Sequence, residues 1–173
     1  GAARRDPIPP KGHVYHATAA SLNQRYTADA IVLAGAPAPG FDRDPERYPQ
    51  PPPRPGPKPP HAWPTAGTRT LSTLDTVGRG RFTLVTGIGG ANWVSAAGAQ
   101  DLEIATVVIG PGQQYGDPYG DWARLSEVAD GGALLVRPDG YVAFRHATAA
   151  ASGEDAERLL TEALAAALNL GAM

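Results

Sequence analysis

The chain contains no cysteine among its 173 residues. That absence excludes disulfide bonds, thiol redox chemistry and metal sites built on thiolates. Lysine is scarce too, because Lys11 and Lys58 are the only two, and the formal net charge is −2. This charge gives no reason to expect binding to nucleic acid or to an anionic membrane surface.

Long apolar runs are also missing. No stretch approaches the roughly 18 consecutive apolar residues that a membrane helix needs. Arg4 and Arg5 are followed by a proline-rich stretch and not by the apolar core of a signal peptide. We therefore expect a soluble, cytoplasmic protein with no membrane partner.

Proline, in contrast, is plentiful and concentrated in one stretch. Twelve of the 18 prolines fall between residues 37 and 64. Because proline fixes φ and lacks the backbone N–H, this stretch favours an extended, semi-rigid arm. An alternative interpretation is that residues 51–55 form a ligand for an SH3-type domain. The prolines divide the chain into an expected first segment, a linker and a domain, at residues 1–35, 36–65 and 66–173.

Residues 66–173 alternate between strand and helix patterns. Apolar, β-prone segments predict strands, and segments with apolar residues on one face predict helices. Asp121 is expected to be the N-cap of the second helix. The expected order is strand, strand, helix, strand, helix, over residues 69–74, 81–86, 91–100, 102–109 and 121–128.

A hairpin and a long helix follow. Pro138 and Gly140 predict a tight turn between strands 133–136 and 141–145. The last helix is expected to start with a capping-box-like pattern of Ser152 and Asp155, to carry a Glu154–Arg158 pair, and to have Gly171 just past its end as the C-cap. A parallel βαβ unit, an antiparallel hairpin and a closing helix predict a thioredoxin-like α/β domain, with a central mixed sheet and flanking helices.

Gly87, Gly89 and Gly90 join strand 81–86 to the helix that follows. A glycine turn of this kind can bind phosphate, because the helix N-terminus offers unpaired N–H groups. Asn92, however, stands where a dinucleotide fingerprint needs its third glycine, and no acidic residue ends the next strand. The sequence favours a structural turn. A small nucleotide-dependent enzyme that uses the Gly87–Gly90 turn remains an alternative.

Three other groupings of reactive side chains have simpler explanations. Two histidines without a third ligand are solvated more often than metal-bound. A hydroxyl, a histidine and a carboxylate without a nucleophile elbow do not make a triad. Carboxylates beside turn residues serve turns and caps. We therefore predict no catalytic, cofactor-binding or metal residue from these groupings, which are His13 with His16, His61 with Ser72 and Asp75, and Asp117 with Asp121.

Leu22–Leu33 is apolar and β-prone, yet the prolines separate it from the α/β pattern. A lone two-stranded ribbon is marginal in water and has an open edge. We therefore expect this segment to dock on a second body. Its candidate docking residues are Asn23, Gln24, Arg25 and Tyr26.

Several motifs occur together in one order along the chain. Their combination resembles the C-terminal region of FAD-dependent aromatic hydroxylases, the phenol and chlorophenol monooxygenase group. Leu22–Tyr26 with Ala30–Val32 resembles the end of the substrate domain just upstream in those enzymes. The motifs are His61–Trp63, Ser72–Asp75, Gly80–Gly87, Trp93 and Leu135–Arg145.

The resemblance implies a non-catalytic, thioredoxin-like domain that lacks redox cysteines and serves structure and subunit assembly. FAD and NAD(P)H would be bound by the preceding part of the parent enzyme, and not by this chain. Residues 1–35 would be the tail of a substrate domain, and Asn23–Tyr26 would contact the flavin and substrate half. The partner would be that flavin-bearing half or a second copy of the chain. A free-standing thioredoxin-like module that binds another protein remains an alternative.

Overall fold

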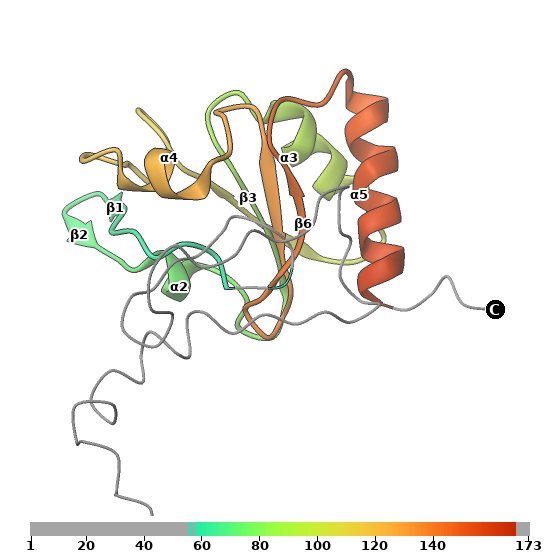
Figure 1. Ribbon diagram of the computed structural model, residues 1–173, viewed down its shortest axis with the longest axis horizontal. Helices are drawn as coiled ribbons and strands as arrows, with labels where there is room; N and C mark the ends of the chain where they lie inside the picture. The colour runs from blue at the N-terminus through green and yellow to red at the C-terminus, as the bar shows by residue number, and fades with distance from the viewer. Residues whose placement is uncertain (1–55, 57, 169–173) are drawn as a thin grey trace, which may run out of the picture.

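A computed structural model describes residues 56 and 58–168 of the chain. A four-stranded mixed sheet forms its centre, in the order β4-β3-β5-β6 (Figure 1). β3 and β4 run parallel, whereas β3–β5 and β5–β6 are antiparallel pairs. The strands are β3 (Phe82–Thr86), β4 (Ile104–Val108), β5 (Ala133–Val136) and β6 (Val142–His146).

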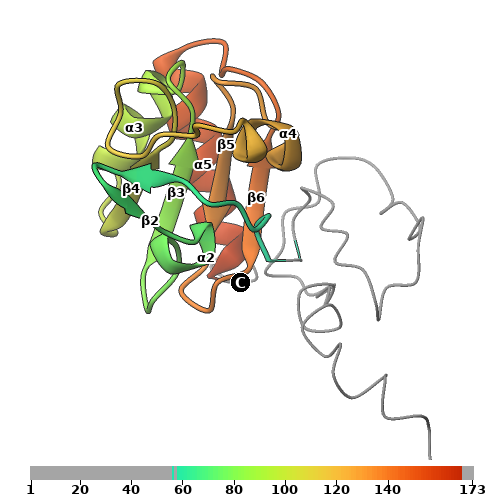
Figure 2. The same cartoon turned by 90° about the vertical axis from the view of Figure 1, so that its left-hand side faces the viewer.

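Two layers cover the two faces of this sheet. Figures 1 and 2 show α3 and α5 together on one face, with α4, α2 and the small β1–β2 ribbon on the other. The covering elements are β1 (Thr65–Ala66), β2 (Arg69–Thr70), α2 (Thr73–Thr76), α3 (Ala91–Gly98), α4 (Asp121–Ser126) and α5 (Gly153–Ala167).

The core lies on both faces of the sheet because successive strand residues point to opposite sides. Leu84 and Leu135 pack in the cluster with α3 and α5, whereas Val85 and Leu134 pack in the cluster with α4. Every residue of β3 and β5 is buried. Because both faces of these central strands are covered, their sequences are largely apolar and do not alternate.

The βαβ unit and the hairpin are confirmed. β3, α3 and β4 lie within two residues of the predicted bounds at each end. The hairpin turn is closed by the N–H of Gly140, which donates to the carbonyl of Arg137 at 2.9 Å. Gly140 has a φ of 85°, the left-handed conformation that favours glycine there.

The strand predicted over residues 69–74 is wrong beyond Thr70. Ser72 is the N-cap of α2, and its hydroxyl accepts a hydrogen bond from the N–H of Leu74 at 3.2 Å. The remaining strand, β2, pairs with β1 and not with the central sheet. The serine at the N-cap with Asp75 three residues later is a helix-start pattern that competes with the alternation of apolar residues.

The N-cap predicted for α4 is also wrong. Gly120, with a φ of 65°, occupies that position, and Asp121 is the first helical residue. The carboxylate of Asp117 accepts the N–H of Ala123 at 3.1 Å and so satisfies one of the helix's unpaired donors. The helix ends two residues before the predicted residue 128, because Glu127 adopts a left-handed φ of 47°.

α5 begins as predicted but ends earlier. The hydroxyl of Ser152 accepts the N–H of Asp155 at 3.1 Å, which confirms the N-cap. Leu168 is the C-cap, so the prediction of Gly171 is wrong. The helix packs through buried Leu160 and Leu164 against the sheet and α3.

The ion pair predicted between Glu154 and Arg158 is replaced by two others. Arg158 contacts Asp155 at 2.6 Å and Glu162 at 2.9 Å. The hydrogen bond from Arg158, together with a second from the N–H of Ala151, lowers the pKa of Asp155. The hydrogen bonds to Asp155 and Glu162 raise the pKa of Arg158. Sequence spacing allows i,i+3 and i,i+4 partners alike, so it does not choose among three nearby carboxylates.

Residues 58–64, part of the predicted linker, pack on the domain. Ala62 is only 1% exposed and belongs to the cluster beside α4. The hydroxyl of buried Thr73 donates to the carbonyl of Pro60 at 2.7 Å and accepts the N–H of Ala62 at 3.0 Å. One side chain of α2 therefore holds this stretch of chain in place.

Thr73→Val should lower the free energy of unfolding by about 1–3 kcal/mol, because the buried N–H of Ala62 and carbonyl of Pro60 lose their partner. Chemical denaturation of the full chain measures this. Thr70→Val, at an exposed position of β2, is the control and should change stability by less than about 0.5 kcal/mol. Equal denaturation midpoints for the two variants would show that residues 58–64 do not contribute to the domain's stability.

Candidate functional site

The glycine turn lies between β3 and α3, at the carboxyl ends of the two parallel strands. Ligands bind at this edge in many α/β proteins. Here, the chain's own atoms occupy the space beside the glycines. A Cβ added at Gly87 would lie 2.6 Å from the carbonyl oxygen of Asp130. A Cβ added at Gly90 would lie 1.8 Å from the hydroxyl oxygen of Thr86. These glycines are needed for close packing within the chain.

Two backbone donors of the turn are also in use. Gly89 donates its N–H to the carbonyl of Asp130 at 2.9 Å, and Gly90 donates to Gly87 at 3.1 Å. A phosphate would need these N–H groups free and facing it. The geometry therefore favours the structural interpretation of the turn over a nucleotide site.

Two buried side chains tie the same loop to the core. The hydroxyl of Thr86 donates to the carbonyl of Gly132 at 2.6 Å, and the indole N–H of Trp93 donates to Gly131 at 2.9 Å. Thr86 ends β3 and Trp93 lies in the first turn of α3. The segment 130–132 is therefore fixed against both ends of the glycine turn.

A cavity of about 150 Å³ lies beside the turn. Val85, Ile109 and Trp122 form its buried apolar lining, and Asp117 and Asp130 also line it. A cavity of this volume can hold a molecule the size of benzene when its lining is apolar. Asp117 already accepts the N–H of Ala123, and no nucleophile–base pair is found among the described residues that line the cavity.

The triad considered in the sequence does not assemble. His61 is exposed, with its ring 4.8 Å from the ring of Trp63. Ser72 caps α2, and Asp75 lies 3.5 Å from Arg79. No hydrogen bond joins the three side chains within the described part of the chain.

Other residues weighed in the sequence analysis lie outside the described residues. These are the histidines His13 and His16, and the docking candidates Asn23, Gln24, Arg25 and Tyr26. Asp121, considered as an acid partner of Asp117, instead pairs with Arg124 at 2.6 Å.

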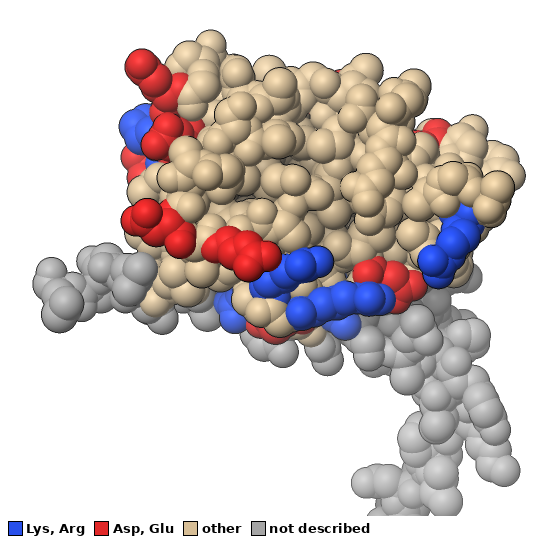
Figure 3. Space-filling model, turned by 180° about the vertical axis from the view of Figure 1, so that it is seen from behind, with Lys and Arg blue, Asp and Glu red and all other residues tan. Residues whose placement is uncertain are grey.

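Charged groups do not converge on a metal site in residues 58–168. No group of three or more His, Cys, Asp or Glu side chains there is placed to hold an ion. Figure 3 shows a broad uncharged area on one face, with charged side chains along its edges. None of the helices described is long and apolar enough to cross a membrane.

The contacts that close the turn were missed by sequence reasoning. Trp93 and Gly131 are 38 residues apart, and Thr86 and Gly132 are 46 apart. Helical and strand periodicities reach only a few residues, so they do not detect such pairs. The Gly131–Gly132 pair was the available signal of a close backbone approach.

Comparison with known proteins decides the family. The profile described as "Aromatic-ring hydroxylase, C-terminal" matches residues 52–169. The chain belongs to this family. It is 45% identical to 2,4-dichlorophenol 6-monooxygenase of Delftia acidovorans, over 83% of this chain and 25% of that enzyme. It is 35% identical to phenol 2-monooxygenase of Pseudomonas sp. (strain EST1001), over 90% of this chain and 26% of that enzyme.

Solved structures give the same result. The flavin-dependent monooxygenase PieE, crystallised with FAD and substrate, matches 89% of this chain with a TM-score of 0.76 and 44% identity. Aklavinone-11 hydroxylase, crystallised with FAD and aklavinone, matches 86% with a TM-score of 0.71 and 33% identity. This chain covers 26% of each of these two proteins.

The predicted resemblance to the C-terminal region of FAD-dependent aromatic hydroxylases is therefore confirmed, and the parent family is one of FAD-dependent monooxygenases. The chain spans about a quarter of the length of the relatives that it matches.

Proposed function

We propose that this chain is the non-catalytic C-terminal portion of a cytoplasmic, FAD- and NAD(P)H-dependent aromatic hydroxylase, and that it serves structure and assembly. The observation that carries the proposal is the closed glycine turn. Gly87 and Gly90 pack against the chain's own atoms, and the N–H groups of Gly89 and Gly90 are already bonded. The flavin chemistry then belongs to the part of the enzyme that precedes this domain.

The topology supports a thioredoxin-like domain that has no redox function. The order β4-β3-β5-β6, with a parallel βαβ unit and an antiparallel hairpin, is the arrangement expected of that fold. The turn that would carry the cysteine pair of such a fold runs here from Ile88 to Trp93. The chain has no cysteine at all.

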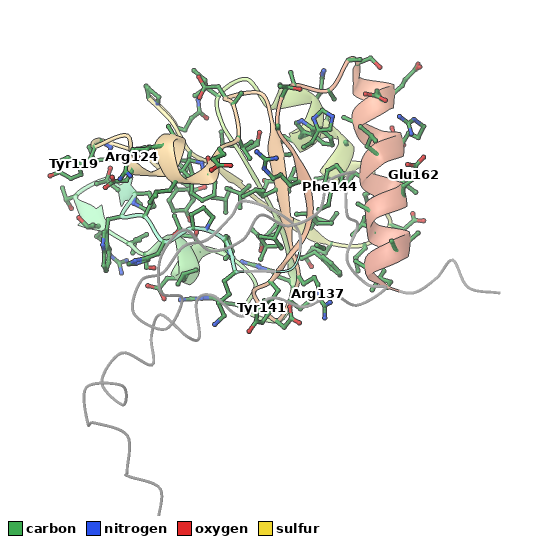
Figure 4. All side chains as sticks on the ribbon, in the orientation of Figure 1. Tyr119, Arg124, Arg137, Tyr141, Phe144 and Glu162 are labelled. Atoms are coloured by element: carbon green, nitrogen blue, oxygen red, sulfur yellow. The ribbon has the colours of Figure 1, made fainter. Side chains whose placement is uncertain are left out.

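Exposed aromatic residues support a role in contacts with another body. Tyr119 is 83% exposed and Trp63 is 52% exposed. Figure 4 shows Tyr119 at the end of the described structure remote from α5. Aromatic residues are enriched where proteins meet. The proposed partner is the flavin-bearing half, with a second copy of the chain as the other candidate.

The remaining parts of the chain complete the proposal. Residues 1–35 would be the tail of the substrate domain, and residues 36–65 would connect it to the domain at 66–173. Asn23–Tyr26 within Leu22–Leu33 would provide the contact to the flavin half. The apolar residues of that segment support this role, because each stabilises a contact by about 1.5–3 kcal/mol when fully buried.

A chimera tests the proposal. The matching C-terminal quarter of the Delftia acidovorans enzyme is removed, or replaced by this chain. We expect the truncated enzyme to lose subunits, seen in gel filtration as a fall in size greater than the removed mass, and to melt at lower temperature. The chimera should regain both properties, together with hydroxylation of 2,4-dichlorophenol.

The control is the same chimera with Trp93→Ala, which removes a fully buried core side chain and should not restore assembly. A truncated enzyme that keeps the subunit number and the melting temperature of the intact enzyme would contradict a structural role. A truncated enzyme that stays assembled with full FAD content but loses hydroxylation would point to a catalytic role instead.

A further inference from the structure

Three arginines line one groove on the described surface. Arg69 comes from β2, Arg79 follows α2, and Arg81 precedes β3. The groove has a volume of about 460 Å³, and Asp75 is its one carboxylate. In Figure 3, basic side chains lie along the lower edge of the face shown, with acidic side chains beside them, whereas the centre of that face is uncharged.

Two of these arginines have no partner in the described part of the chain. The guanidinium groups of Arg69 and Arg81 make no ion pair or hydrogen bond with another described residue, and that of Arg79 reaches Asp75 only at 3.5 Å. The other arginines within residues 58–168 each have a partner, which is a carboxylate for Arg124, Arg137 and Arg158 and the Glu127 carbonyl for Arg145. The unpartnered guanidinium groups are therefore concentrated in this groove.

The backbone that carries Arg79 and Arg81 is held in place. Gly78 donates its N–H to the hydroxyl of buried Thr83 at 3.1 Å, and Gly80 donates to the carbonyl of Pro138 at 3.1 Å. Gly78, Arg79 and Gly80 all have positive φ, of 70°, 57° and 84°. The segment is thus a defined turn, fixed to β3 and to the hairpin.

We propose that this groove binds an acidic segment of a protein chain, rich in Asp or Glu. Guanidinium groups bind carboxylates through paired, charge-assisted hydrogen bonds. Several arginines spread along an open groove suit several carboxylates of an extended segment, whereas a small ligand needs an enclosed pocket. The side chain of Arg79 is 67% exposed.

Leu71 and Tyr115, both half-buried, also line the groove and offer apolar contacts to the stems of acidic side chains. If the proposed function holds, the acidic segment belongs to the flavin-bearing part of the enzyme. The groove is then one of the surfaces through which the two parts dock.

The test uses the full chain and two labelled eight-residue peptides, one built from Glu and Gly and the other from Gln and Gly. Fluorescence anisotropy at low salt should show binding of the Glu peptide and little binding of the Gln peptide. Arg69→Gln with Arg81→Gln should weaken binding about eightfold, which corresponds to about 0.6 kcal/mol for each of the two exposed ion pairs that are lost. Added salt should weaken it further.

The matched control is Arg124→Gln with Arg137→Gln, which removes two arginines that already have partners. It should keep affinity within about twofold of the parent chain. Equal binding of both peptides, or an equal loss in both double variants, would overturn the proposal. So would competition by inorganic phosphate at concentrations where acetate has no effect, because that marks a phosphate site.

Assembly of the chimera and peptide binding by the full chain together separate this proposal from the proposed function. If the unmodified chimera does not assemble but peptide binding still depends on Arg69 and Arg81, the groove stands and the proposed function fails. If the chimera assembles and the peptide does not bind, the proposed function stands and the groove proposal fails.

Discussion

Gly90→Ala should lower the free energy of unfolding by about 2–6 kcal/mol, and alanine is also a poorer N-cap residue than glycine at this start of α3. The added Cβ would lie 1.8 Å from the hydroxyl of Thr86. That hydroxyl is buried and donates to the carbonyl of Gly132, so it cannot rotate away freely. Overpacking costs about 1–3 kcal/mol, and loss of the buried hydrogen bond costs about as much again.

Two further variants make the result specific. Gly98→Ala, at the last residue of α3, meets no atom within 4 Å and should stabilise the chain by about 0.5–1 kcal/mol. Thr86→Ala removes the hydroxyl oxygen that lies closest to a Cβ added at Gly90, but the Cβ of residue 86 remains 2.7 Å away. Gly90→Ala should therefore cost less in the Thr86→Ala background, although not zero. Equal effects of Gly90→Ala and Gly98→Ala in urea titrations would show that the turn is loosely packed.

Trp93→Ala should lower the free energy of unfolding by about 3–5 kcal/mol, the usual cost of emptying a large buried site. Its side chain is 0% exposed, and its ring packs near Phe144 and His146 at centroid distances of 5.9 and 5.2 Å. Trp93→Phe keeps most of the packing but leaves the carbonyl of Gly131 without its donor. That variant should cost about 1–3 kcal/mol.

Trp63→Ala is the matched control, because that tryptophan is 52% exposed. It should change stability by less than about 0.5 kcal/mol. Circular dichroism during chemical denaturation separates the three tryptophan variants. If Trp93→Ala and Trp63→Ala have the same midpoint, Trp93 does not hold the loop at Gly131 against the core.

The elements that sequence predicted well are those that local patterns determine. β3 and β5 are continuous apolar runs, because both faces of a central strand are buried. The hairpin follows from Pro138 and Gly140, since each residue fits the backbone conformation required at its position in the turn. Ser152 begins α5 because its hydroxyl satisfies a helix N–H that would otherwise lack a partner.

The parts that sequence did not predict depend on contacts between distant residues. The strand expected over 69–74 ends at Thr70, where β2 pairs with β1, and the buried hydroxyl of Thr73 in α2 bonds Pro60 and Ala62, more than ten residues away. The closure of the glycine turn requires the loop at Asp130, about 40 residues away. The motif alone left a nucleotide site open as an alternative, and the packing around Gly87 and Gly90 with the bonded N–H groups of Gly89 and Gly90 argues against it.

Flavin titration of the purified full chain is the most direct test of the proposed role. The chain is incubated with excess FAD and then separated from free FAD by gel filtration, with flavin absorbance recorded across the protein peak. A protein peak without flavin absorbance is the expected result, since the N–H groups of Gly89 and Gly90 are already bonded within the chain. Flavin that elutes with the chain at one equivalent would contradict the proposal that the chemistry belongs to another part of the enzyme.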